Sequence, residues 1–158
     1  MEETYISIMI QSLRKKAAVL DEIIRQDDLQ KDYLMDPECE VEKFDETVEN
    51  KNRLIEQLTY LDSGFEKLYA QVAEELEGKK AEHATEIREM QSLIKNITDK
   101  SVMIQAQEAR NKDLMMQKFG VIKKHARNVR ANSKAITGYY RTMNPANFMD
   151  PQFMEKKQ

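Results

Sequence analysis

The sequence predicts an all-α protein, an antiparallel bundle of three to four long helices with coiled-coil-like packing and a flexible C-terminal tail. Charged residues make up 34% of the 158 residues, which is typical of long solvated helices. The chain holds only four glycines and three prolines, so helix-breaking positions are few. Apolar residues recur at intervals of four and three, which places them on one stripe of a helix. We therefore expect a helical bundle over residues 1–142 and a disordered tail over 143–158.

The first helix is expected over about residues 3–34. Its apolar stripe is formed by Ile6, Ile10, Leu13, Ala17, Leu20 and Ile24. Asp36–Pro37 ends it, because the residue before a proline is pushed out of the α region.

The second helix is expected over about 40–76. Its stripe comprises Phe44, Lys51, Leu54, Leu58, Leu61, Phe65, Leu68, Val72 and Leu76, with one lysine among apolar residues. Gly64 lies inside this pattern, and because the periodicity passes through it we expect a continuous helix with another helix packed closely there. Gly78 follows the last stripe residue and predicts a C-cap and turn, with a kink in one long helix as the alternative.

The third helix is expected over about 80–137 and carries two stripes. The first contains Ile87, Met90, Ile94, Ile97, Ser101 and Ile104. Residues 105–113 then form a polar gap, after which the apolar residues resume with their phase slipped by one position. This gap indicates either a bend or the end of one packing partner.

The second stripe has no obvious partner in the sequence. It comprises Met115, Phe119, Ile122, Ala126, Val129, Ser133, Ile136 and Tyr140. In an up-down bundle the second helix ends opposite residue 115, so residues 115–140 would extend on the order of 35–40 Å further. The second stripe must therefore fold back, pair with another copy or bind a partner.

Charge is distributed unevenly along the chain. Asp21–Glu49 contains twelve acids and three bases, whereas Lys112–Arg141 contains eight bases and one acid. We therefore expect the second stripe to be partly covered by the acidic Asp21–Glu49 end at rest.

The residues offer little for catalysis. His83 and His125 are far apart, and the chain has no Gly-rich phosphate loop, nucleophile elbow or cysteine cluster. We expect a protein that is not an enzyme and holds no cofactor or metal. Cys39 is the single cysteine, and no stretch resembles a signal peptide or a membrane span, so we expect a cytoplasmic protein.

The segment Asn50–Tyr69 (NKNRLIEQLTYLDSGFEKLY) resembles a helix of the FlgN-like flagellar export chaperones of Gram-positive bacteria. The ending Phe153–Lys157, which is aromatic, hydrophobic, acidic and then Lys-Lys, is similar to the ending common in that family. Asn132–Tyr139 followed by a proline-containing tail fits the same layout. The resemblance covers nearly the whole chain in helix order.

The resemblance implies a cytoplasmic, all-α protein without enzymatic activity. Such chaperones bind the C-terminal segments of hook-associated (hook–filament junction) proteins, keep them unassembled and deliver them to the type III export gate. The positions implied for the cargo groove are Met115, Phe119, Ile122, Val129 and Ile136. Those implied for docking to the export gate are Tyr139, Tyr140, Phe148 and Phe153. In this reading the covered stripe yields to cargo, and the methionines, six of which follow residue 100, suit a surface that accepts varied apolar helices.

Two alternatives remain open at this stage. The first is a homo-oligomeric coiled-coil scaffold in which Met115–Tyr140 pairs with its own copy. The second is a regulator that binds nucleic acid or a transcription factor through the basic 118–141 segment, although the overall acidic balance makes nucleic acid the less favoured partner.

Overall fold

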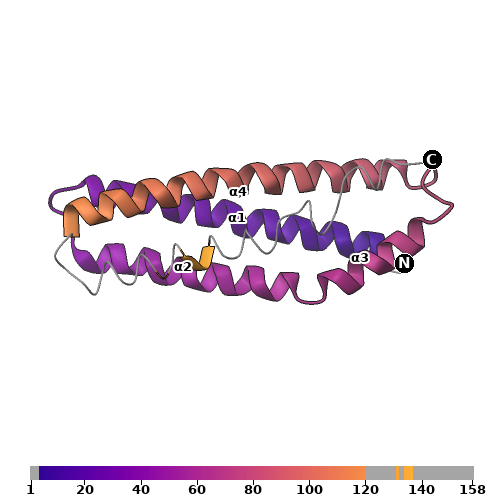
Figure 1. Cartoon of the computed structure of the whole chain (residues 1–158), viewed down its shortest axis with the longest axis horizontal. Helices are drawn as coiled ribbons and strands as arrows, with labels where there is room; N and C mark the ends of the chain where they lie inside the picture. The colour runs from indigo at the N-terminus through magenta and orange to yellow at the C-terminus, as the bar shows by residue number, and fades with distance from the viewer. Residues whose placement is uncertain (1–3, 120–130, 132–133, 137–158) are drawn as a thin grey trace.

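The computed structural model describes residues 4–119, 131 and 134–136, and in this part the chain is all α-helical. Four helices follow one another: α1 (Tyr5–Met35), α2 (Val41–Asp62), α3 (Phe65–Leu76) and α4 (Ala84–Phe119). They lie side by side as one elongated bundle (Figure 1). This confirms the predicted all-α helical bundle. None of the described helices is both long enough and apolar enough to cross a membrane.

Helix α1 begins and ends where local chemistry requires. The Thr4 hydroxyl accepts a hydrogen bond from the Ser7 amide at 3.0 Å, which caps the first turn. At the other end, Asp36 takes an extended conformation (φ −89°, ψ 113°) directly before Pro37. The predicted stop at Asp36–Pro37 is confirmed, and α2 then starts at Val41, close to the expected residue 40.

The expectation of one continuous helix over 40–76 is wrong. Helix α2 ends at Asp62, and Gly64 takes a left-handed conformation (φ 76°) before α3 begins at Phe65. A Cβ atom at Gly64 would meet nothing within 4 Å in the described structure, so close packing of another helix is not the reason for this glycine. Its role is the backbone turn, because non-glycine residues avoid positive φ. The apolar stripe crosses the break because α2 and α3 both pack against α1.

The predicted turn at Gly78 is confirmed. Helix α3 ends at Leu76, Gly78 has φ 73°, and turns lead to α4 at Ala84, four residues later than the expected start. Helix α4 then continues unbroken through 105–113 to Phe119. The polar gap is therefore no break in the helix.

Helix α1 is the central element, and its contacts fix the direction of the others. Ion pairs to α2 join Lys16 with Asp62 at 3.2 Å and Asp27 with Lys51 at 2.8 Å, so the residue numbers rise on α1 as they fall on α2. Those helices are antiparallel. Contacts to α4 join Asp21 with Lys100 at 2.6 Å and the Tyr33 carbonyl with Lys118 at 3.1 Å, so both numbers rise together. Helices α1 and α4 are therefore parallel, in an up-down-up order (Figure 1).

The described residues form two apolar clusters. The larger, here called the main core, runs along the bundle from Ile6 and Leu76 to Ile23 and Ile104 and includes Ile136. The smaller, here called the end cluster, is formed by Leu34, Phe44, Val48, Met115 and Phe119. Residues 134–136 are helical and lie beside α2 rather than beyond the end of α4 (Figure 1). For Ile136, which is 1% exposed, the fold-back alternative therefore holds; the rest of the helix expected up to residue 137 lies mostly outside the described residues.

Candidate functional site

The residues predicted for the cargo groove do not all come together. Met115 and Phe119 meet in the end cluster, where the rings of Phe44 and Phe119 lie 5.6 Å apart at 56°. Ile136 belongs to the main core instead. Ile122 and Val129, and the positions predicted for gate docking, lie outside the described residues: Tyr139, Tyr140, Phe148 and Phe153.

The start of the second stripe is covered by the acidic end of the bundle. Met115 and Phe119 are buried against Leu34, Phe44 and Val48, all of which lie within the Asp21–Glu49 range. The predicted covering is thus confirmed for Met115 and Phe119.

Lys118 reinforces this contact from the basic side. Its Nζ donates to the backbone carbonyls of Tyr33 and Asp36, at the C-terminal end of α1. The same carbonyls accept backbone hydrogen bonds from the Asp36 and Cys39 amides, and they lie at the negative end of the helix dipole, so a lysine there is favourable.

A buried polar layer separates the main core from the end cluster. At its centre, the Lys51 Nζ lies 2.8 Å from Asp27 Oδ1 and 2.6 Å from Glu108 Oε2. Lys51 also donates to Gln30 Oε1 at 3.2 Å. Asn111 joins the layer by donating to the Asp27 carbonyl at 2.8 Å. Side chains from α1, α2 and α4 therefore meet at one level of the bundle.

The charges in this layer do not balance if all three groups ionise, because two carboxylates face one ammonium group. The pKa of Asp27 is raised to about 8, chiefly by burial and next by its hydrogen bond with Glu108, while the attraction of Lys51 opposes the rise. Asp27 Oδ2 accepts no hydrogen bond from an N–H or O–H donor among the described residues. A proton held between the two carboxyl groups would satisfy this oxygen and make the layer neutral.

The phase slip in α4 lies later in the helix than the sequence predicts. Ile104, Glu108, Asn111 and Met115 follow one another at intervals of four, three and four, and all four are buried. The stripe therefore continues through the polar gap, with polar residues at core positions, and the slip falls between Met115 and Phe119. The signal available in the sequence was Lys51, a lysine in an apolar stripe that required buried acids elsewhere.

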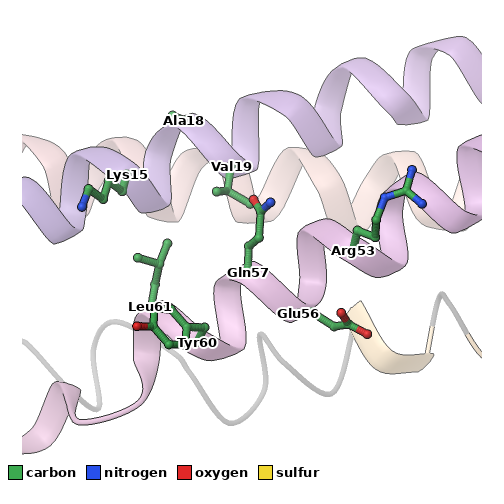
Figure 2. A pocket seen from close by; sticks show the side chains of 8 residues that line it. All are labelled: Lys15, Ala18, Val19, Arg53, Glu56, Gln57, Tyr60 and Leu61. Atoms are coloured by element: carbon green, nitrogen blue, oxygen red, sulfur yellow. The ribbon is translucent and has the colours of Figure 1, made fainter.

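A surface groove lies between α1 and α2. It encloses about 670 Å³ and is lined by Lys15, Ala18, Val19, Arg53, Glu56, Gln57, Tyr60 and Leu61. Figure 2 shows the Gln57 side chain reaching from α2 toward Val19 on α1. A neighbouring hollow of about 290 Å³ shares Lys15, Tyr60 and Leu61 and extends the groove to Ile8. Tyr60, which is 79% exposed, therefore lines both hollows.

This groove could not be predicted from the sequence, because its shape depends on how α1 and α2 pack. Within the described part, no group of three or more His, Cys, Asp or Glu side chains is arranged to hold a metal ion. Comparisons of the chain with protein-family models, with curated proteins and with solved structures found no match.

Proposed function

We propose that this protein is a cytoplasmic flagellar export chaperone. In this proposal it binds the C-terminal segments of hook-associated proteins, keeps them unassembled and delivers them to the type III export gate. The proposal rests on the resemblance of Asn50–Tyr69 to FlgN-like chaperones. The observation that supports it is the end cluster, a small apolar unit isolated from the main core.

The end cluster has the properties that a reversible binding surface needs. Only five buried apolar side chains of the described chain form it, and the polar layer lies between it and the main core. Met115 is a member of the cluster and Met116 packs against it, and the flexible side chains of methionines repack around varied apolar partners. An amphipathic cargo helix can exchange with the residues that cover Phe44 and Val48 while the main core stays intact.

The affinity for cargo depends on this exchange between a cargo helix and the residues that cover Phe44 and Val48. Met115 and Phe119 are buried in the free protein, so cargo replaces existing apolar contacts rather than covering bare surface. Burying one large apolar side chain is worth about 1.5–3 kcal/mol, and most of that gain cancels when one contact replaces another. A cargo segment that is disordered when free also loses conformational entropy on binding. The expected complex is moderately stable and readily released, as delivery requires.

The groove between α1 and α2 offers a second contact of the same kind. Five of its eight lining residues, Arg53, Glu56, Gln57, Tyr60 and Leu61, come from the Asn50–Tyr69 segment that carries the family resemblance. Helix-in-groove recognition places the apolar side chains of a partner helix into hollows of this form.

The test is co-expression with hook-associated proteins of the same bacterium. We expect a soluble complex that is lost in Ile122→Asp and Val129→Asp, two variants in the predicted cargo groove. Tyr5→Asp is the matched control, because Tyr5 is exposed at the start of α1. Failure to form a complex with any hook-associated protein would refute the proposal. Loss of helicity in the two groove variants, measured by circular dichroism, would instead assign the second stripe to ordinary core.

A further inference from the structure

The face of α4 that points away from the bundle also carries residues at regular helical spacing, here called the outer stripe. Lys95, Asp99, Val102, Ala106, Ala109 and Asp113 follow one another at intervals of four and three, and all six are exposed. At its centre, Val102 is 63% exposed and its neighbour Met103 is 51% exposed. Heptad spacing of this kind is the pattern by which one helix packs along another.

The charges at the two ends of this stripe are opposite in sign. Lys95 lies at one end and Asp113 at the other, each about equally distant from the midpoint near residue 104. In a parallel pair of such helices each residue faces its own copy, so Lys95 would meet lysine and Asp113 would meet aspartate. In an antiparallel pair centred at residue 104, Lys95 of each copy faces Asp113 of the other copy, so this ion pair forms at both ends. Only the antiparallel arrangement gives complementary charges.

Across the two-fold axis of such a pair, Asp99 faces Ala109 of the second copy, because their residue numbers also have 104 as their midpoint. The neighbouring Arg110 takes no part in this contact, because its guanidinium group lies 3.8 Å from Asp28 on α1 of its own chain. Val102 faces Ala106 across the same axis, so apolar side chains meet at the centre and ion pairs form at the ends.

We propose that the outer face of α4 is an interface between two copies of this chain, packed antiparallel about a two-fold axis near residue 104. The occupant is a second copy because the charges are self-complementary in that arrangement. The buried stripe of α4 packs against α1, so the outer face lies on the opposite side of the helix. This inference does not depend on the proposed chaperone function.

The size of the stripe sets the strength of the association. Residues 95–113 span about 27 Å of helix, with four exposed apolar side chains at the centre. A stable interface buries about 800 Å² on each partner, which is more than one helix face of this length provides. We therefore expect a weak dimer, with a dissociation constant on the order of 10–100 µM.

Sedimentation velocity of the full chain over about 5–500 µM tests this directly. The weight-average mass should rise with concentration from 18.5 kDa toward about 37 kDa, twice the mass of one chain. Val102→Glu should keep the protein monomeric. Met35→Glu is the matched control, because Met35 is also 63% exposed but lies on α1, and it should dimerise like the unaltered chain. A monomer at every concentration, or a Val102→Glu variant that still dimerises, overturns the proposal.

A charge swap tests the antiparallel register. Lys95→Asp and Asp113→Lys should each weaken the dimer about tenfold, and the double variant should restore it. The Lys95–Asp99 pair within α4 is lost in Lys95→Asp and in the double variant but kept in Asp113→Lys, so a dimer restored in the double variant cannot be due to that pair. A double variant as weak as the single ones would contradict antiparallel pairing. Circular dichroism of each variant should show unchanged helicity, since every altered side chain is exposed.

Discussion

Replacing Asp27 by asparagine should remove most of one pH-dependent contribution to stability. Asp27 is packed against Lys51 of α2 and Glu108 of α4, and its pKa in the folded protein is raised to about 8 from an ordinary value of 3.8. Asparagine has nearly the same shape and stays neutral at every pH. The variant therefore keeps the packing of the polar layer but does not have to take up a proton on folding.

The sign and size of this pH-dependent contribution to the free energy of unfolding follow from proton linkage. Because the pKa is higher in the folded state, the contribution of Asp27 to stability is complete below pH 4 and is lost as the pH rises to about 8. The loss is about 1.4 kcal/mol per pH unit, which sums to on the order of 5 kcal/mol across that range. The free energy of unfolding of Asp27→Asn, minus that of the unaltered chain, should increase with pH at this slope and level off above pH 8.

Urea unfolding followed by circular dichroism at pH 5, 6, 7, 8 and 9 measures this difference. Asp32→Asn, the same change at an exposed position of α1, is the control and should alter stability by less than about 0.5 kcal/mol at each pH. A difference that stays constant or falls with rising pH would show that Asp27 is ionised in the folded protein. In that case the attraction of Lys51 would outweigh burial.

Three further changes test other parts of the structure. Lys51→Met leaves Asp27 and Glu108 buried without their cation and should destabilise the fold by about 3–5 kcal/mol at pH 7, with a smaller loss at pH 5, measured by the same urea titrations. Gly64→Ala should cost about 1–2 kcal/mol, because alanine must adopt φ 76° although no atom obstructs its Cβ; a gain in stability would show that the two helices join. Phe44→Ala opens a cavity in the end cluster and should cost about 3–5 kcal/mol, and hydrogen exchange should quicken in Phe44–Val48 and Met115–Phe119 more than around Met90; uniform quickening would contradict a separate end cluster.

The sequence predicted those features of the fold that depend on local chemistry. The stop at Asp36–Pro37 follows from the geometry of proline, and the turn at Gly78 follows from a glycine at the end of an apolar stripe. The break at Gly64 was missed because periodicity reports which face is buried and does not report whether the backbone is continuous. Since α2 and α3 both pack against α1, their apolar stripes join across the turn.

The candidate site was harder to predict, because it depends on residues that are distant in the sequence. Met115 and Phe119 were identified from their spacing, but their partners Leu34, Phe44 and Val48 depend on the up-down-up register. Residues 105–113 read as a gap because Glu108 and Asn111 are polar, although both occupy core positions. A polar side chain at a core position can be recognised only when its partners are known, here Lys51 and Asp27.

The polar layer gives the bundle its register at some cost in stability. Burying Asp27, Lys51 and Glu108 gains little compared with well-packed apolar residues, because each charge must leave water. The three helices can nevertheless align in only one way that pairs all three groups. If α4 moved along α1 by one heptad, Glu108 would leave Lys51, and one or more buried charges would lose their partner. The layer therefore fixes which residues build the end cluster, and it does so without apolar contacts that would join that cluster to the main core. A bundle built in this way can open at one end while its register is held by the layer behind it.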